Sequence, residues 1–479
     1  MDIIHEENHG DIDAIILLNF MVEMDWILNK VPLLRRRDIP VLILHGLRDD
    51  QDPNTGLYSL KFSNEEIHEY YSKYNIMLRQ VKVDDPYGCA HAKAALIFYK
   101  AGIRVAIHTA NYIEMDFDYK TQGVYVQDFP LLSATQTPSK HEPFPFGAEL
   151  FDFLQKMELF DRSGEDDKTN LKADAKRMWQ EYRHRLHQYD FSTADVVLIP
   201  SVPGRWKGVD PEGKSNLHKY GHMKLKRVLE HYNASAHSSA GSNLVIQTSS
   251  IGSMGKGEKK LSEIASSMGS GLGSLQVLWP TLECVRTSCV GYKSGSGIPC
   301  RQDALFENGR FKEIYGRCMY KWAGNSPSRT LYTPHIKTYF KYKTSGSSLV
   351  ILDWFLLTSS NLSQAAWGVL EKDSTQLFLK SFELGVLYVP QRVKTPFRLF
   401  SLTPTHPLLG FDADNTPHAL YSANPRRFVV SMELVREVTN ASDIHFPIPF
   451  KISPEKYSGI DVPWTYDTFR PTPDRFGGR

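Results

Sequence analysis

Short apolar segments alternate with amphipathic segments along the chain. In the first half, four apolar runs have the length and the β-branched content of buried strands: Ala14–Phe20, Val41–His45, Ala95–Tyr99 and Val105–Thr109. The charged segment Asp174–His187 instead spaces its apolar residues for one face of a helix. The pattern therefore predicts strands covered by helices.

A second series of the same kind begins after residue 190. Val196–Pro200 and Asn243–Ser249 predict strands, and Gly221–Tyr232 predicts a helix between them. A chain of 479 residues has room for two or three domains at roughly 100–200 residues each. We predict an α/β protein with two domains, 1–189 and 190–479, each a mixed sheet flanked by helices.

Composition narrows the functional classes. Hydrophobic residues make up 41% and charged residues 23%, which is ordinary globular usage and excludes a disordered or coiled-coil chain. The formal net charge is +2, so any surface that binds nucleic acid must be local. Five cysteines without a CxxC pair favour a reducing, intracellular compartment. No apolar run approaches the roughly 18 residues of a membrane span, so we expect no membrane partner.

A repeated polar pattern is the strongest chemical signal. His91-Ala92-Lys93 is followed by an apolar segment, Asn111 and then Gln122. In the second half the same order is His335-Ile336-Lys337, Asn361 and Glu383. The second copy is longer between its Asn and its Glu, which predicts an additional hairpin near Asp373–Lys380. One HxK motif arises often by chance, but two at equivalent places indicate function.

The repeat predicts a pocket for one phosphate diester. Alternate residues of a strand share a face, so each HxK motif would present an imidazole beside an ammonium group. Two such sets facing each other would bind the phosphate oxygens and stabilise the transition state through Lys93, Lys337, Asn111 and Asn361. One histidine could attack phosphorus while the other protonates the leaving oxygen. Zinc is the alternative for paired histidines, but no HExxH or CxxC motif completes a ligand set, so we expect neither a metal nor another cofactor.

With these motifs the chain resembles the phospholipase D superfamily and, within it, the tyrosyl-DNA phosphodiesterase family. The usual superfamily motif has an Asp seven residues after the His, where this chain has Phe98 and Tyr342. The absence of that Asp resembles the tyrosyl-DNA phosphodiesterase variant. Further segments resemble the family in the family's order: Ile107–Asn111, Lys120–Gly123, Pro203–Arg205, Thr248–Gly255, Val285–Ser288, Pro334–Tyr339, Thr358–Gly368 and Glu383–Pro390. The resemblance implies two similar phospholipase D-like domains related by pseudo-two-fold symmetry.

Two positions near the first motif depart from the family. Ala90 stands where the family usually has a second His, and Ala92 stands where it has Thr. These departures predict reduced activity or an altered pH profile.

The resemblance also implies a mechanism and a substrate. His91 would be the nucleophile that forms a phosphohistidine with a DNA 3′ end, and His335 would be the acid and then the base. The substrate would be the tyrosyl peptide of a stalled topoisomerase I on the 3′ end of single- or double-stranded DNA. We expect Glu383 to orient His335 as an imidazolium, and Gln122 to leave His91 neutral. We also expect a monomer in the nucleus, with the cytoplasm as a second location.

Other residues match the family's contacts to DNA and peptide. The resemblance implies that Tyr87 stacks on a base, that a serine cluster binds DNA phosphates, that Ser359 contacts phosphate or peptide, and that Trp464 lies near the peptide. The serine cluster is Ser249, Ser250 and Ser253. Packing in the core is the alternative for Tyr87 and Trp464.

Two other functions stay open. The first is a broader 3′-end-processing nuclease or phosphodiesterase of the same superfamily, acting on other 3′ adducts or on lipid. The second is a catalytically weak DNA-end-binding protein, suggested by Ala90 and Ala92. The intact His91, Lys93, His335 and Lys337 argue against the second.

Overall fold

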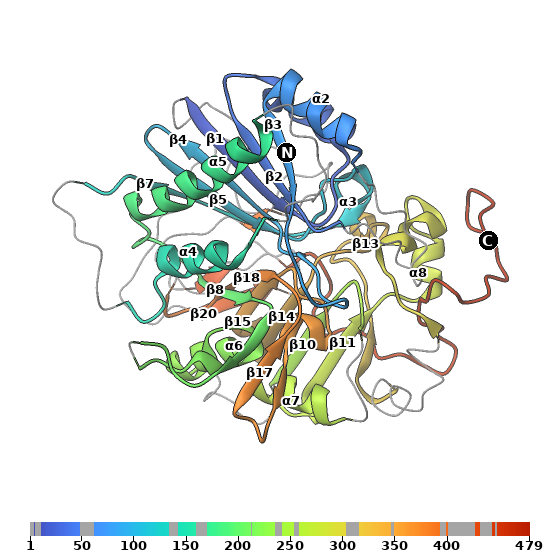
Figure 1. Cartoon of the computed structure of the whole chain (residues 1–479). Coiled ribbons are helices and arrows are strands. Elements are labelled where there is room, and N and C mark those ends of the chain that lie inside the picture. Colours follow the sequence, from blue (N-terminus) through green and yellow to red (C-terminus); the bar gives the residue numbers. More distant parts are fainter. Residues whose placement is uncertain are drawn as a thin grey trace.

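Two β-sheets, one above the other in Figure 1, form the centre of the computed structural model. The structure describes residue 4 and residues 11–47, 62–133, 142–159, 170–211, 213–234, 242–252, 258–302, 316–345, 349–392, 399–400, 427–431, 443–445 and 448–479.

The first sheet has seven strands in the order β19-β7-β5-β4-β1-β2-β3. They are β1 (Ile12–Asn19), β2 (Val41–His45), β3 (Ile76–Gln80), β4 (Ala94–Tyr99), β5 (Gly102–His108), β7 (Val124–Pro130) and β19 (Leu399–Phe400). The strands β1, β2 and β3 pair in parallel, whereas β1, β4, β5 and β7 pair antiparallel. The central strands are buried along their whole length, as nearly continuous apolar runs require.

The second sheet follows the path β12-β11-β10-β14-β15-β18-β8, and β20 and β21 extend it at β15. Its strands are β8 (Val197–Ser201), β10 (Asn243–Gln247), β11 (Leu275–Trp279), β12 (Met319–Lys321), β14 (Thr338–Ser345), β15 (Leu349–Thr358), β18 (Glu383–Tyr388), β20 (Arg427–Ser431) and β21 (Asp443–His445).

The two sheets repeat one topology. In the first, β3-β2-β1 are parallel neighbours and β1-β4-β5-β7 are antiparallel ones. In the second, β12-β11-β10 are parallel and β10-β14-β15-β18 are antiparallel. Six strands of each sheet therefore match in their order and in the parallel or antiparallel pairing of neighbours. In this match β4 is equivalent to β14, and β7 is equivalent to β18.

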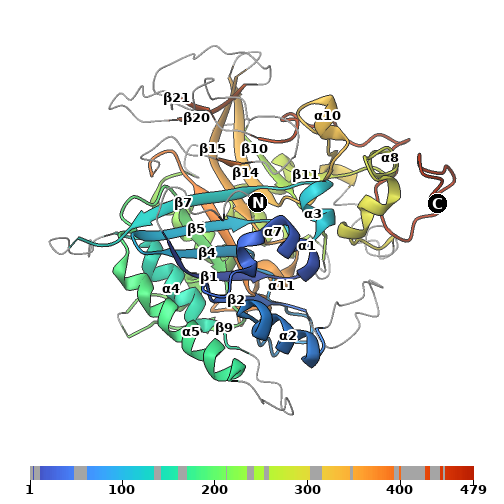
Figure 2. The ribbon, with the colours of Figure 1, turned by 90° about the horizontal axis from the view of Figure 1, so that it is seen from above.

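Helices and two small sheets surround this pair (Figures 1 and 2). The helices are α1 (Met24–Lys30), α2 (Asn64–Tyr74), α3 (Glu114–Asp118), α4 (Phe146–Lys156), α5 (Leu171–Arg185), α6 (Gly221–His231), α7 (Lys259–Ser267), α8 (Leu282–Arg286), α10 (Pro327–Thr330) and α11 (Gln364–Trp367), with 3-10 turns η1 (Pro32–Arg35), η2 (Leu186–Gln188), η3 (Asn216–His218), η4 (Leu272–Ser274) and η5 (Gly291–Gly297). One small sheet pairs β6 (Lys120–Thr121) with β13 (Thr333–Pro334); the other joins β9 (Gly204–Lys207), β16 (Val369–Glu371) and β17 (Gln376–Leu379).

Most elements lie where the sequence predicts them. The predicted strand Val41–His45 is β2, and the predicted helix Gly221–Tyr232 is α6 with one residue fewer. The additional hairpin near Asp373–Lys380 is β16 and β17, an antiparallel pair whose turn places Asp373 at φ 53°. Strand pairing crosses the predicted division at residue 190, because β19 pairs with β7 and β13 pairs with β6.

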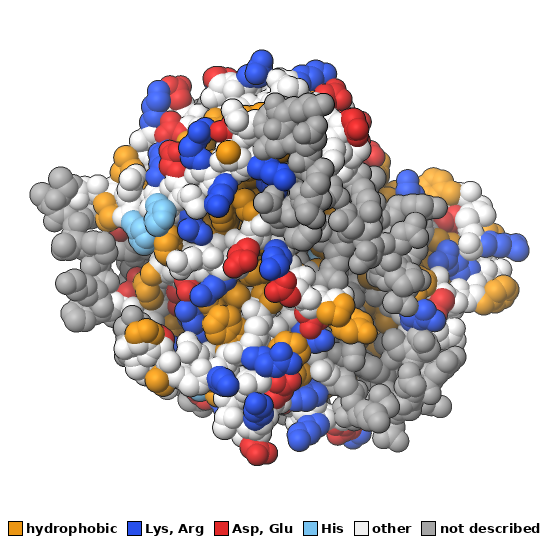
Figure 3. Space-filling view, in the orientation of Figure 1, with side chains coloured by type: hydrophobic (Ala, Val, Ile, Leu, Met, Phe, Trp, Pro, Cys, Tyr) orange, Lys and Arg blue, Asp and Glu red, His pale blue; other side chains and the backbone are white. Residues whose placement is uncertain are grey.

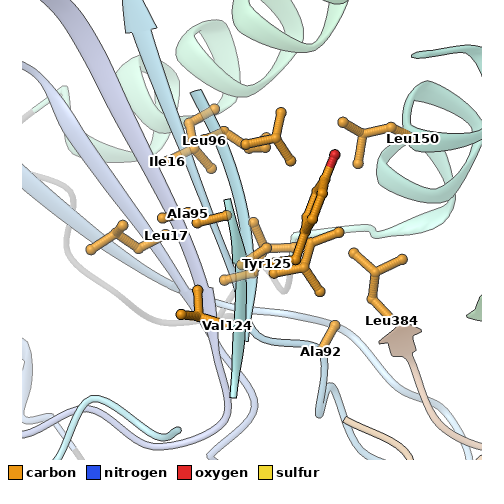
Figure 4. Packing of buried hydrophobic residues seen from close by; sticks show 14 of the residues in the cluster. Ile16, Leu17, Ala92, Ala95, Leu96, Val124, Tyr125, Leu150 and Leu384 are labelled. Carbon is orange, nitrogen blue, oxygen red and sulfur yellow. The ribbon is translucent and has the colours of Figure 1, made fainter. Parts of the chain in front are cut away.

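The two halves share a hydrophobic core. One cluster of buried residues contains members of both sheets. Leu384 of β18 lies beside Tyr125 and Leu150 of the first half (Figure 4). At Gly123 the fit is close, because a Cβ there would lie 2.7 Å from Cδ1 of Leu357 and 2.9 Å from Cδ1 of Ile336. Packing of this kind fixes the position of one half on the other.

Leu384→Ala tests this shared core. The side chain is fully buried, so the substitution leaves a cavity between the halves and lowers the free energy of unfolding by about 2–5 kcal/mol. Denaturant titration measures the loss. Leu229→Ala is the matched control, because Leu229 is equally buried but lies in the other cluster. A loss at Leu384 far below that at Leu229 would contradict a continuous core.

Candidate active site

Both HxK motifs lie just outside a strand. His91–Lys93 directly precedes β4, and His335–Lys337 connects β13 to β14. The prediction that the motifs lie on strands is therefore wrong. Each lysine instead folds back on its own motif: Nζ of Lys93 donates to the carbonyl of His91 at 2.9 Å, and Nζ of Lys337 donates to the carbonyl of His335 at 2.6 Å. The two motifs are equivalent, since β4 and β14 are equivalent strands.

His91 is held by the second half of the chain. Its backbone N–H donates to the carbonyl of Phe382 at 2.9 Å, and the N–H of Phe382 donates to the carbonyl of Cys89 at 2.8 Å. Its Nδ1 lies 3.0 Å from Oε2 of Glu383. The hydroxyl of Ser359 donates to the same carboxylate oxygen. A fixed carboxylate at Nδ1 leaves Nε2 as the nitrogen that can act on a substrate.

His335 is held by the first half. The carbonyl of Thr121 accepts both the N–H of His335 at 3.0 Å and that of Ile336 at 2.8 Å. Nδ1 of His335 lies 3.2 Å from Nε2 of Gln122 and 3.3 Å from Oδ2 of Asp116. Gln122 is itself fixed, because its Oε1 accepts from the hydroxyl of Thr109 and its Nε2 donates to the carbonyl of Asp116.

The histidine partners are therefore exchanged between the halves. The prediction that Glu383 orients His335 and Gln122 orients His91 is wrong: Glu383 contacts His91, and Gln122 contacts His335. The reason is that both segments cross the boundary between the halves. The strand β6 pairs with β13, and Phe382 forms a bridge with Ala90.

Burial and charge depress the pKa of both imidazoles. For His91, burial lowers the pKa, and Glu383 opposes it only in part. For His335, burial and then Lys337, Lys120 and Lys93 hold the pKa well below its usual range. Burial and these cations thus disfavour an imidazolium at His335 in the free protein.

The two lysines give the site an excess of positive charge. Lys93 and Lys337 are both fully buried. Burial lowers the pKa of Lys93 to about 8. Burial and then Lys93 hold the pKa of Lys337 well below its usual range. Buried like charges repel each other, so a bound anion would stabilise both ammonium groups.

The two asparagines are held differently. Oδ1 of Asn361 accepts from the N–H groups of Ser249 and Ser250 at 3.2 and 3.0 Å, which leaves its Nδ2 for a ligand. Asn111 instead donates its backbone N–H and its Nδ2 to Oδ2 of Asp116, both at 2.8 Å. Within the described part of the chain, Oδ1 of Asn111 is buried and has no hydrogen-bond partner.

Asp116 is the residue that sequence reasoning missed. It lies in α3, is almost fully buried, and contacts both Asn111 and His335. Comparison of the two halves gives no signal for it, because the residue five positions after Asn361 is Ala366. The spacing Asn-x₄-Asp ahead of Lys120 is the only sequence trace of this contact.

The residues that were expected to contact DNA differ in their exposure to solvent. Tyr87 is on the surface, with 79% of the residue exposed, and Nζ of Lys380 lies 4.9 Å from its ring centroid. Ser250 is half-buried and donates to the carbonyl of Pro299. Ser249 is buried, and its hydroxyl donates to Asn361. Ser253 lies outside the described residues.

Ser359 and Trp464, which were expected at the phosphate or the peptide, are also buried. Ser359 is fully buried, and its hydroxyl donates to Glu383; its contact with phosphate or peptide stays a prediction. Trp464 is 1% exposed, its Nε1 donates to the carbonyl of Ile298, and its ring stacks on Tyr292. The packing alternative thus describes Trp464.

Charges of both signs share the surface of the protein. On the face in Figure 3, Lys and Arg side chains are interspersed with Asp and Glu. None of the five cysteines, all of which the structure describes, forms a disulfide bond. Over the described ranges, no group of three or more His, Cys, Asp or Glu side chains is placed to hold a metal ion. Among the same residues, no helix has both the length and the apolar character needed to cross a membrane.

Comparison with known proteins identifies the family. The family model described as Tyrosyl-DNA phosphodiesterase matches residues 1–458. The chain belongs to the tyrosyl-DNA phosphodiesterase family. It is 33% identical to Tyrosyl-DNA phosphodiesterase 1 of Arabidopsis thaliana over 99% of this chain and 72% of that one. It is 28% identical to Tyrosyl-DNA phosphodiesterase 1 of Drosophila melanogaster over 86% of this chain and 67% of that one.

Solved structures of the family have the same fold. The crystal structure of the yeast Tyrosyl-DNA Phosphodiesterase aligns with a TM-score of 0.59 at 16% identity, covering 97% of this chain and 95% of that one. The predicted class, two phospholipase D-like α/β domains, is confirmed.

Glu383→Gln tests the exchanged pairing. The carboxylate of Glu383 raises the pKa of His91 against the effect of burial, so its removal lowers the pKa of His91 further and leaves that of His335 unchanged. NMR titration of ¹⁵N-labelled imidazoles measures both values. Gln122→Glu is the matched control and should raise the pKa of His335 only. If Glu383→Gln moved His335 and not His91, the assigned pairing would be refuted.

Proposed function

We propose that the protein is a DNA repair phosphodiesterase that hydrolyses the bond between a tyrosine and a DNA 3′-phosphate. The observation that carries the proposal is a cluster of two imidazoles and two buried ammonium groups, one of each from either half, in a chain of the tyrosyl-DNA phosphodiesterase family. An excess of buried positive charge suits a phosphate diester, and two imidazoles suit a reaction that needs a nucleophile and a proton carrier.

In the first step, Nε2 of His91 attacks phosphorus. Glu383 at Nδ1 fixes the ring and directs the lone pair of Nε2 outward. The N–P bond forms as the bond from phosphorus to the tyrosine oxygen breaks, and His335 gives its proton to the departing phenolate. The substrate phosphate supplies negative charge beside His335, which raises its pKa and lets it take up that proton. A phenol, with a pKa of about 10, leaves more readily than an alkyl alcohol.

In the second step, the phosphohistidine is hydrolysed. His335, now neutral, takes a proton from water, the water oxygen bonds to phosphorus, and the N–P bond breaks. The products are a DNA 3′-phosphate and regenerated His91. Lys93, Lys337 and Nδ2 of Asn361 stabilise the charge that develops on the non-bridging oxygens.

The proposed contacts to DNA involve residues that are at least partly exposed. Tyr87 offers an open aromatic ring beside the ammonium group of Lys380, a combination that suits stacking on a DNA base and contact with its phosphate. We propose that Ser250, whose N–H donates to Oδ1 of Asn361, contacts the next phosphate. We further propose that the tyrosine is the remnant of a topoisomerase I, that no metal is required, and that the protein acts as a monomer in the nucleus.

A 3′-phosphotyrosyl oligonucleotide in EDTA tests this function. We expect the wild-type protein to release tyrosine and leave a 3′-phosphate, because imidazoles and ammonium groups supply the chemistry. Gel sizing of the product measures the reaction. Turnover of phosphatidylcholine alone would indicate a lipid phosphodiesterase, shortening of an unmodified strand would indicate a broader nuclease, and binding without turnover would indicate a DNA-end-binding protein.

Two variants complete this test by trapping the intermediate. His335→Ala removes the base of the second step, so a covalent DNA–protein adduct should accumulate on the gel. His91→Ala removes the nucleophile and should form no adduct. Either step loses roughly 10²–10⁴-fold in rate when its acid–base group is removed. An adduct formed by the His91→Ala protein would overturn the assignment of the nucleophile.

A further inference from the structure

One buried cation beside the pocket has no counterpart in the other half. Lys120, in β6, is fully buried, and its Nζ has no hydrogen-bond partner within the described part of the chain. Burial of a charged group without a partner is unfavourable, and burial lowers the pKa of this ammonium group, with Asp116 opposing. A side chain in this position is therefore more than a packing element.

The structure makes specific room for this ammonium group. A Cβ at Gly297, in η5, would lie 1.8 Å from Nζ of Lys120. The ammonium group thus rests against the bare Cα of a glycine, and any side chain at position 297 would displace it. Both the lysine and the glycine are needed for the observed placement.

Lys120 lies in the segment that holds His335. It directly precedes Thr121, whose carbonyl accepts the N–H of His335, and its charge acts on that imidazole. The charged and titratable groups that face His335 are Lys337 of its own segment, Lys120 of β6, Asp116 of α3, and Lys93 and His91 from the segment before β4. Lys120 is the member of this set that is neither in an HxK motif nor hydrogen-bonded within the described residues.

The second half has no lysine at the position equivalent to Lys120. Two positions before Glu383 the second half has Ser381, whose hydroxyl accepts the N–H of Cys89 at 3.1 Å. His91 therefore meets one carboxylate, whereas His335 meets a carboxylate and an additional cation. Two histidines in matching places thus have different electrostatic surroundings, as two different proton-transfer roles require.

We propose that Lys120 is a positioning residue that acts through His335: its buried charge disfavours the imidazolium and returns His335 to the neutral base that the second step needs. This inference rests on the proposed function for its catalytic consequence. Lys120 does not touch the reacting atoms. Its effect falls on the hydrolysis of the phosphohistidine, and on the acid side of the pH profile, where a protonated His335 cannot accept a proton from water.

Lys120→Met in the full chain tests the inference. Without the cation, the pKa of His335 rises, so the pH at which adduct hydrolysis is half-maximal moves upward. Below that midpoint the lifetime of the adduct should increase about tenfold for every pH unit by which the midpoint rises, and at high pH the adduct should decay as in the wild type. Single-turnover decay of the adduct across pH measures the profile. Lys341→Met is the control, since Lys341 is a buried lysine that donates to Gly269 and does not face the pocket.

A second variant and a second measurement keep the test independent of folding and of activity. Gly297→Ala displaces the ammonium group without removing it and should move the profile in the same direction. NMR titration of His335 in the free protein should give a higher pKa in both variants. An unchanged pKa of His335 in a folded variant would overturn the inference. If wild-type protein formed no adduct, the proposed function would fail, while the titration would still decide the role of Lys120.

Discussion

Each histidine of the pocket is held by the opposite half of the chain, and the geometry of the active site follows from this exchange. The carbonyl of Thr121 fixes the backbone of His335, and the carbonyl of Phe382 fixes that of His91. The side chains of Gln122 and Glu383 come from the same two segments. Neither imidazole has its orienting partner until the two sheets are in place. The shared hydrophobic core is therefore part of the catalytic apparatus.

Charge explains why such a pocket selects a phosphate diester. Lys93, Lys337 and Lys120 are buried close together, and among the described residues Asp116 and Glu383 oppose them. The resulting excess of buried positive charge is energetically unfavourable in the free protein, and a bound anion would offset it. Burial, together with these cations, lowers the pKa of both imidazoles and so disfavours their charged forms before substrate arrives. The surroundings of the two rings differ, with Glu383 beside His91 and Asp116 and Lys120 near His335. This difference supports the proposed division between attack and proton transfer.

Part of this arrangement could be predicted from sequence. The apolar runs predicted the central strands, since buried strands need little beyond a short apolar segment. The HxK repeat predicted a shared pocket, because two matching sets in a duplicated fold come together at the symmetry axis. The extra length before Glu383 predicted the hairpin of β16 and β17.

The errors arose where contacts cross between the halves. We paired Gln122 with His91 and Glu383 with His335 because of their order along the chain. That order cannot show that β6 of the first half pairs with β13 of the second. Asp116 gave no signal because Ala366 stands at the matching place. The hydrogen bond from Ser359 to Glu383 also left no trace in the sequence. Each of these features depends on a contact between residues that are far apart in the sequence or on the burial of a side chain. A short sequence motif reveals neither.

A crystal structure with a 3′-phosphate oligonucleotide bound is the decisive measurement for a pocket built from both halves. We expect one phosphorus atom between Nε2 of His91 and Nε2 of His335, with phosphate oxygens within hydrogen-bond distance of both Lys93 and Lys337. A phosphate bound through the residues of one half alone, with the other histidine and lysine making no contact, would show that the two halves do not act on one phosphorus atom.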